Sequence, residues 1–484
     1  MNLTLFIPEI ILAAVVVLVI LLDLFVRQAS VLRAVALVGL IGSAGVAVAM
    51  WNGGNNPIFN NMLAVDNFAI FFKLLFAGIA FLVILGSADY ADKFKRFKGE
   101  YYALILMATL GMSLMAASAD LISIYVALEL TSISLYVLVS FLKDRNSTEA
   151  SLKYLLLGAI ASAVLLYGMA LIFGVTGQTH LGGIAAVLQG PTGMVDSPAL
   201  LLGIVLIIAG FGFKIAAVPF QMWVPDVYEG APTTVTAFLS VASKAAGFAL
   251  ILRVFHSAFG MPGWLSDNWG MIFAGLAVIS MVVGNVTAIP QTNIKRMLGY
   301  SSIAQAGYLM VGLATMGFAA SSDILGQSGV LFFLASYALT NLGAFIAIII
   351  ITSKIDSDAI ADFAGMAKRA PLLALALTLS LISLIGMPPA AGFMAKFYIF
   401  SSAVDNGLLW LVIIAAINSV ISAFYYLRVV KVMWFGEAAS SEKVPSSGMP
   451  RVALILCCAG VLFLGVFPGL LMRLAELAGK MFSF

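Results

Sequence analysis

The sequence predicts an all-α polytopic membrane protein with about 14 transmembrane helices, ten of them in two inverted five-helix repeats. Three observations predict this class. The 484 residues are 62% hydrophobic and only 10% charged, whereas soluble domains carry roughly 25% charged residues. Apolar stretches long enough to cross a bilayer recur along the whole chain. Two of these stretches are interrupted by prolines near their middle.

Each expected span is an apolar stretch of about 20 residues, the length that crosses a bilayer as a helix. The expected spans are residues 8–26, 31–51, 64–88, 101–118, 120–142, 148–174, 200–228, 232–256, 269–290, 298–318, 329–352, 371–401, 408–434 and 451–473. The least certain division lies between the fourth and fifth spans, which only residues 116–120 separate. No large soluble domain fits, because the weakly apolar stretches are loop-sized.

The basic residues test this count independently. The connections that follow odd-numbered spans hold seventeen of the 25 Lys and Arg: Arg27, Arg33, Lys93, Lys95, Arg96, Lys98, Lys143, Arg145, Lys295, Arg296, Lys354, Lys368, Arg369, Arg428, Lys431, Lys443 and Arg451. The opposite face holds only Arg253, Arg473 and Lys480. The positive-inside rule assigns the first face to the cytoplasm, so both termini are expected outside.

Buried charge points to function. Four charged side chains lie inside long apolar stretches without charged neighbours in sequence: Glu129, Lys214, Lys244 and Lys396. Carrying one charge to the bilayer centre costs roughly 2.5 to 3.5 kcal/mol, so such residues usually line an ion pathway. Glu129 is the one acidic residue expected at membrane depth. Lys73 lies in the middle of the third span, and Lys153 lies about one turn into the sixth, from where its amine could reach the surface.

Helix breaks accompany two of these lysines. The seventh span carries Lys214 and then Pro219 and Pro225, and the twelfth carries residues 386–396 (GMPPAAGFMAK). Proline removes an intrahelical hydrogen bond, and the freed backbone groups need protein or water as partners, so a polar interior is expected. The breaks are five spans apart, which is an odd number, so spans four to eight and nine to thirteen would form inverted copies. Ordinary proline kinks in packed helices are the alternative.

This organisation predicts four regions of the chain. Residues 1–100 hold three N-terminal helices, 101–258 and 259–435 hold the two half-channel repeats, and 436–484 hold a C-terminal helix.

Polar side chains at helical spacing extend the pattern. They are Tyr125, Glu129, Ser132 and Tyr136 on one face, Ser240 one turn before Lys244, then Ser301, Gln305 and Tyr308, and finally Tyr337 with Asn341. They predict a hydrated seam, although hydrogen bonds that join helices in a dry bundle would use the same residue types. Burial disfavours the charged form of lysine, and a nearby carboxylate favours it again. A row of such groups could therefore pass protons laterally, from one helix to the next.

Redox chemistry has no recognisable site in this sequence. Cys457 and Cys458 are adjacent in an apolar stretch, and His180 and His256 lie at loops or helix ends, which suits neither a metal centre nor a haem pair. No Cys-x-x-Cys or phosphate-binding glycine motif occurs. Asp226 and Glu229 fall in a turn after the broken seventh span, where simple solvation and a role in proton uptake are both open.

A resemblance to a known family covers essentially the whole chain. Residues 214–232 (KIAAVPFQMWVPDVYEGAP), residues 125–132 (YVALELTS) and residues 386–396 resemble the antiporter-like membrane subunits of respiratory complex I, NADH:quinone oxidoreductase. Within that family, the chain lacks the long carboxy-terminal extension of the largest subunit, and it has Lys396 where a sister subunit has an acidic group.

The resemblance implies roles for five residues. Glu129 and Lys214 would form a proton-transfer pair, Lys244 would connect, and Lys396 would lie on the exit side, with Lys153 a further candidate near Glu129. The chain would be a subunit of a proton-translocating enzyme in the bacterial inner membrane without a redox centre of its own. NADH, FMN, iron-sulfur clusters and quinone would belong to partner subunits.

The implied partners are neighbouring membrane subunits, lipid, protons and water, with no nucleic acid. Three other interpretations stay open at this point. They are a subunit of a multi-subunit sodium/proton antiporter, a structural subunit that does not conduct ions, and a stand-alone solute carrier.

Overall fold

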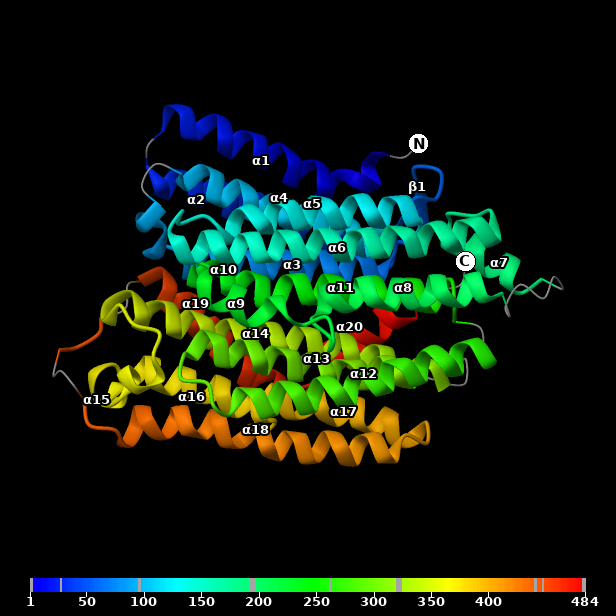
Figure 1. Cartoon of the computed structure of the whole chain (residues 1–484). Helices are drawn as coiled ribbons and strands as arrows, with labels where there is room; N and C mark the ends of the chain where they lie inside the picture. The colour runs from blue at the N-terminus through cyan, green and yellow to red at the C-terminus, as the bar shows by residue number, and fades with distance from the viewer. Residues whose placement is uncertain are drawn as a thin grey trace.

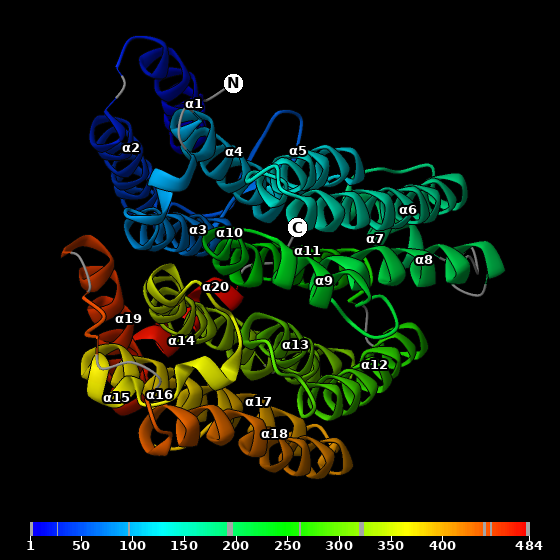
Figure 2. The same ribbon diagram turned by 60° about the vertical axis from the view of Figure 1, so that its left-hand side comes forward.

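The computed structural model describes residues 3–26, 28–94, 97–190, 197–260, 263–318, 324–438, 442–445 and 448–480. Over these residues the chain is almost entirely helical, which confirms the predicted class. In Figures 1 and 2 the helices lie roughly parallel, with α1 and α2 on one side of the bundle and α18 on the other. Arg27, Lys95 and Arg96, which contributed to the predicted topology, lie outside the described residues.

The N-terminal part contains a short 3-10 helix, three long helices and one hairpin of two strands. They are η1 (Leu3–Phe6), α1 (Ile7–Phe25), α2 (Ala29–Ala49), β1 (Asn56–Ile58), β2 (Leu63–Val65) and α3 (Asn67–Gly86). The strands are antiparallel, with Pro57 opposite Ala64. Helix α3 begins where the Asp66 carboxylate accepts a hydrogen bond from the Ala69 amide at 2.8 Å, which satisfies one of the free N–H groups at a helix start.

The next helices are η2 (Tyr90–Phe94), α4 (Lys98–Ala117), α5 (Leu121–Val139), α6 (Arg145–Thr176) and α7 (Leu181–Leu188). The expected division between the fourth and fifth spans is confirmed, because the Asp120 carboxylate caps α5 through the Ile122 amide at 2.8 Å. Helix α7 lies between the sixth and seventh expected spans, in a weakly apolar stretch that was expected to be a loop. We call the end of the bundle at which α1 and α5 end and α4 and α6 begin the basic end; it is on the left in Figure 1.

Both predicted helix breaks are present. Helix α8 (Pro198–Ile215) stops before α9 (Trp223–Gly230), and α16 (Pro371–Ile385) stops before α17 (Ala391–Asp405). Each first half ends at a residue with left-handed backbone, Ala216 at φ 62° and Gly386 at φ 89°. Backbone N–H groups that turn back toward the last helical carbonyls close each end, for example Ala217 to Gly212 at 2.8 Å, as in common C-terminal caps.

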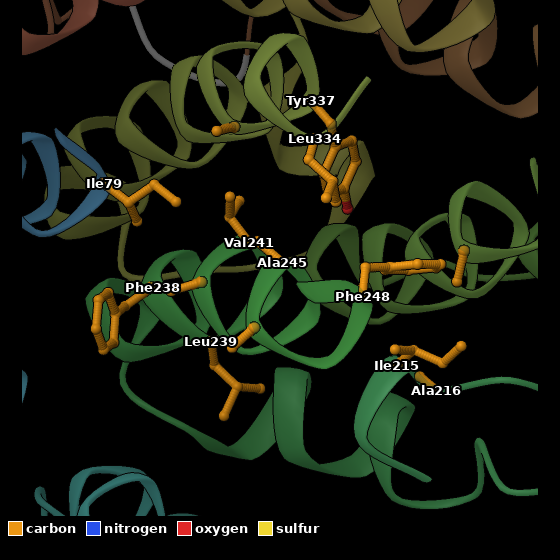
Figure 3. Packing of buried hydrophobic residues seen from close by; sticks show 14 of the residues in the cluster. Ile79, Ile215, Ala216, Phe238, Leu239, Val241, Ala245, Phe248, Leu334 and Tyr337 are labelled. Atoms are coloured by element: carbon orange, nitrogen blue, oxygen red, sulfur yellow. The ribbon is translucent and has the colours of Figure 1, made fainter. Parts of the chain in front are cut away.

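A fully enclosed helix crosses the centre of the bundle. It consists of α10 (Thr233–Phe238), the π-helical turn η4 (Leu239–Ser243) and α11 (Lys244–Ser257). Every residue of its most apolar 18-residue stretch is buried inside the bundle. Figure 3 shows side chains of three other helices around it, Ile79 of α3, Ile215 of α8 and Leu334 of α14. The sequence did not predict the π-helical turn, a distortion that is often found at functional sites.

The second half continues with α12 (Trp264–Ala288), α13 (Ile294–Phe318), α14 (Leu325–Ile355), η5 (Ile360–Phe363), α15 (Met366–Arg369) and α18 (Leu409–Phe435). The last expected span is interrupted at Phe467 and Pro468, giving α19 (Gly448–Val466) and α20 (Gly469–Gly479). This break was not predicted, although the Pro468-Gly469 pair is a recognised signal for one.

Twelve helices in the described part are long and apolar enough to cross a membrane. They match twelve of the expected spans, and the other two expected spans correspond to α13 and to the broken pair α16 and α17. The count of about 14 spans and the inverted repeats stay predictions.

Candidate functional site

Lys214 lies in the last turn of the half-helix α8, and its side chain is 3% exposed. Its ammonium donates a hydrogen bond to the Ser132 hydroxyl of α5 at 2.9 Å. The break beside it is closed by Trp223, whose ring N–H donates to the Phe213 carbonyl at 3.0 Å. The proline-rich sequence after α8 therefore ends the helix at the point where the lysine enters the interior of the bundle.

Glu129 lies on α5 less than one turn before Ser132 and is partly buried. Its carboxylate accepts a hydrogen bond from the Ser162 hydroxyl of α6. The predicted partners Glu129 and Lys214 thus meet at one short segment of α5, which contains Glu129 and contacts Lys214 through Ser132. Sequence reasoning missed Ser162, because nothing in its sequence neighbourhood distinguishes it from other small polar residues.

Lys153 is placed differently from the expectation. It was expected near Glu129, but its side chain is 45% exposed and forms ion pairs with Glu149 at 3.0 Å and Asp226 at 2.9 Å. Both partners lie at the basic end of the bundle, one of them on α9. The expectation that its amine could reach the surface is confirmed, because the flexible side chain extends to a carboxylate there.

Lys153 contributes to a polar pocket of about 270 Å³ at that end, together with Asn146, Glu149, Asp226, Glu229 and Arg296. Arg296 pairs with both Asp226 at 2.8 Å and Glu229 at 2.9 Å. Burial opposes ionisation of Asp226, but hydrogen bonds from Lys153 and Arg296 outweigh it and hold the pKa of this carboxyl below its ordinary value.

Lys244 begins α11, directly after the π-helical turn, and is 1% exposed. Its ammonium donates to the backbone carbonyl of Ser302 on α13. The Ser302 hydroxyl in turn lies 3.3 Å from the Tyr228 hydroxyl of α9. One turn before Lys244, the Ser240 hydroxyl accepts a hydrogen bond from the Asn341 amide of α14 at 2.7 Å. Ser240 and Asn341, which were predicted as polar interior residues, therefore contact each other, whereas Ser302 and Tyr228 were not predicted.

Lys396 lies on α17 and is 5% exposed. Its ammonium donates to the carbonyls of Leu384 at 3.3 Å and Ile385 at 2.8 Å, and to the Ser419 hydroxyl at 2.8 Å. Those two carbonyls belong to the last turn of α16, whose end carries a partial negative charge. The break thus supplies the acceptors for the lysine, and the face of the Tyr308 ring lies 4.2 Å from the ammonium.

Helix α13 connects the surroundings of Lys244 and Lys396. Gln305 donates to the Leu384 carbonyl at 3.0 Å, the same carbonyl that Lys396 contacts. Ser301, one turn earlier, shares a hydrogen bond with the Tyr426 hydroxyl. The predicted polar stripe of α13 is therefore buried, and its helix contacts Lys244 through Ser302 and Lys396 through Tyr308.

An open cavity of about 470 Å³ lies beside Lys396, between α17 and α18. Its lining includes Ser401, Asp405 and Ser419 among apolar side chains. This space gives Lys396 a route to the surface of the chain.

Two further buried ion pairs were not predicted. Glu9 of α1 contacts Lys73 of α3 at 2.6 Å, with side chains 2% and 5% exposed. Glu129 is thus not the only acidic residue inside a span. Arg253, expected in a connection at the outer face, is instead fully buried in α11 and makes two hydrogen bonds to Asp66 at 3.0 and 3.1 Å. Neither pair can be predicted from sequence, because the partners lie far apart along the chain.

Within the described residues, no group of three or more His, Cys, Asp or Glu side chains is arranged to hold a metal ion. Cys457 and Cys458 are free thiols in α19.

A helical membrane bundle with a lysine at each of two helix breaks, and with buried polar contacts between them, defines an ion-translocating type of membrane protein. Similarity to known proteins indicates the same class. Residues 118–422 match the family described as NADH:quinone oxidoreductase/Mrp antiporter, transmembrane. This chain belongs to that family.

Relatives match along almost the full length. NADH-quinone oxidoreductase subunit N of Dehalococcoides mccartyi is 49% identical over 484 residues, covering 99% of both chains. The protein of the same name from Heliobacterium modesticaldum is 45% identical, again over 99% of both chains.

Among solved structures, a chain of respiratory complex I from Thermus thermophilus superimposes with a TM-score of 0.81 at 32% identity, covering 97% of this chain and 99% of that one. A chain of the Mrp complex from Dietzia superimposes at 0.86 over 99% and 97% of the two chains, but it is 20% identical and shows the fold alone.

Proposed function

We propose that this chain is subunit N of an NADH-quinone oxidoreductase and that it translocates protons through the membrane part of that enzyme. The full-length similarity to proteins of that name supports the assignment. The observation that carries the proton-transfer role is the row of buried groups Glu129, Lys214, Lys244 and Lys396, each with hydrogen-bond partners from another helix or helix half.

Each lysine has a distinct task in this proposal. Lys214 exchanges its proton with the Glu129 side of α5 through Ser132, and movement of either group changes the electrostatic field on the other. Lys244 exchanges its proton through water with the Ser302 and Tyr228 hydroxyls, while the Ser302 carbonyl holds its ammonium in place. Lys396 holds the proton against the Leu384 and Ile385 carbonyls until it leaves through the cavity toward Ser401 and Asp405. Water would fill the gaps between these groups.

Lys153 takes a different role in this proposal from the one first expected. With Asp226, Glu229 and Arg296 it forms a charged pocket that solvent can reach. We place the cytoplasm at this end, in line with the positive-inside rule, with both termini on the outer side of a bacterial inner membrane. Protons would be taken up here.

The four regions 1–100, 101–258, 259–435 and 436–484 remain our proposed division, with the two middle regions as inverted half-channels. The lysine beside each helix break supports the pairing of the halves. NADH, FMN, iron-sulfur clusters and quinone would be bound by partner subunits, and neighbouring membrane subunits would contact this chain. The chain would thus be part of a translocase.

The deciding experiment replaces Lys214 by Met in the intact enzyme. Quinone reduction and proton pumping are measured in membranes whose assembly is checked on native gels. We call the row of Glu129, Lys214, Lys244 and Lys396 the proton relay. Both activities should fall together in the assembled enzyme, because the relay loses an obligatory proton carrier. Lys431→Met is the matched control, since Lys431 is exposed near the end of α18. Full pumping with Lys214→Met would instead favour a structural subunit that does not conduct.

A sodium/proton antiporter subunit is the second candidate, because the matched family includes Mrp antiporters. The two candidates differ in ion dependence. Pumping that requires quinone reduction and is unaffected by sodium supports the oxidoreductase subunit. Sodium-driven proton movement without quinone chemistry supports the antiporter.

A further inference from the structure

A groove at the basic end of the bundle is not used by the proton relay. It lies where α4 packs against α1 and α5, and it has a volume of about 400 Å³. Figure 2 shows these three helices on one side of the bundle, away from α13 and α17. The groove is therefore separate from the row of buried lysines.

The floor of the groove is apolar and open to the side. Leu104 and Met107 of α4 lie in it, and Ile20 of α1 and Val137 of α5 border it with 42% and 44% of their surfaces exposed. Exposed apolar side chains on the flank of a membrane bundle are the surface that acyl chains cover. The apolar lining therefore suits part of a lipid tail.

The mouth of the groove carries one charge of each sign. Glu100 lies in the first turn of α4, and Lys143 follows the end of α5. The Lys143 ammonium lies 3.9 Å from the centre of the Phe97 ring, which leaves its remaining N–H groups able to donate elsewhere. Among the described residues, neither Glu100 nor Lys143 has an ion-pair partner.

We infer that this groove binds a phospholipid whose headgroup contains both a phosphate and a primary ammonium. Lys143 would hold the phosphate and Glu100 the ammonium, while an acyl chain follows Leu104 and Met107 into the groove. The helix ends place the mouth at headgroup depth, where basic residues also gather. A carboxylate in the same groove as the Lys143 ammonium disfavours a headgroup that carries only negative charge.

The test uses the purified, assembled enzyme and a phosphatidylethanolamine analogue with a photoreactive group in its acyl chain. A phosphatidylcholine analogue with the same chain is the comparison, because its quaternary ammonium has no N–H to donate to Glu100. Mass spectrometry identifies the labelled peptides of α4 and α5. We expect the ethanolamine lipid to label them about fivefold more than the choline lipid, the ratio that ~1 kcal/mol of headgroup interaction gives.

Two variants make the result specific. Leu104→Trp fills the groove and should remove most of the labelling, whereas Leu155→Trp, on the exposed face of α6, should not. Glu100→Gln should abolish the preference for ethanolamine over choline, whereas Glu437→Gln, an exposed carboxylate after α18, should leave it intact. Equal labelling by both lipids, or labelling that Leu104→Trp leaves unchanged, would overturn the inference. So would a helix of a neighbouring subunit crosslinked in the groove in place of lipid.

Discussion

Lys396 and Gln305 donate hydrogen bonds to one and the same acceptor, the Leu384 carbonyl, at 3.3 and 3.0 Å. They come from different helices, α17 and α13, and they meet at the free end of α16. When Lys396 releases its proton, its hydrogen bond to the Leu384 carbonyl weakens, whereas the hydrogen bond from Gln305 is unchanged. Gln305 thus keeps the end of α16 in place through the proton cycle and is a positioning residue.

The first prediction concerns Gln305. Gln305→Met keeps the side-chain length but removes the donor, so the Leu384 carbonyl loses one of its two partners, and one such bond is worth about 1 kcal/mol. We expect proton pumping to fall severalfold while the enzyme still assembles, measured in membrane vesicles beside native gels. Gln189→Met, at the exposed end of α7, is the control. Unchanged pumping in Gln305→Met would show that Lys396 alone orders this site.

Gly386 gives a second prediction. A Cβ atom at this position would lie 2.9 Å from Cδ of Lys396, and the backbone has φ 89°. Gly386→Ala must therefore push Lys396 away from the carbonyls of α16. In addition, holding alanine in a left-handed backbone conformation costs roughly 1 to 2 kcal/mol. We expect loss of most proton pumping.

Gly54→Ala separates the two effects. Gly54 also has positive φ, at 83°, but no atom lies within 4 Å of the position that an alanine methyl group would take, so this variant carries the backbone cost alone. Equal losses in the two variants would assign the effect of Gly386→Ala to backbone strain rather than to Lys396.

Asp226 gives a third prediction, on pH. It lies on the short helix α9, and its pKa is lowered by Lys153 and Arg296 despite partial burial. A carboxyl whose pKa is lower in the folded state adds stability above its unfolded value of about 3.9, and this stability is lost as the pH falls through the folded value. Asp226→Asn should therefore lower the thermal stability of the solubilised enzyme at pH 7.

The difference between Asp226→Asn and the unchanged enzyme should shrink as the pH is lowered past about 4. Asp89→Asn, an exposed carboxylate outside this pocket, should show little difference at either pH. A loss of stability that stays constant across the pH range would show that the amide disturbs packing, and that the ion pairs contribute nothing.

Sequence patterns predicted the parts of the site that depend on local chemistry. A proline in the middle of an apolar span interrupts the helix there, so both breaks were predicted, and an isolated lysine in an apolar stretch is visible without a structure. Partners across helices were not predictable. The contact between Lys396 and the end of α16 depends on how two half-helices turn past each other, and the position of Lys153 depends on where Asp226 lies in space. Arg253 was misplaced because a residue near a predicted helix end looks the same whether it faces solvent or a carboxylate such as Asp66.

The Glu9 and Lys73 pair gives the last prediction, and it separates folding from conduction. The pair joins α1 to α3, both side chains are almost fully buried, and Oε2 of Glu9 has no hydrogen-bond partner among the described residues. Removing one member of a buried pair leaves an unbalanced charge and costs on the order of 3 to 5 kcal/mol, whereas replacing both by apolar groups is often neutral. Lys73→Met should therefore reduce assembly on native gels, and the double variant Glu9→Leu with Lys73→Met should restore most of it.

Because the pair lies outside the relay, enzyme assembled with the double variant should pump protons at the normal ratio to quinone reduction. A double variant that assembles but fails to pump would instead place Glu9 and Lys73 on the proton path.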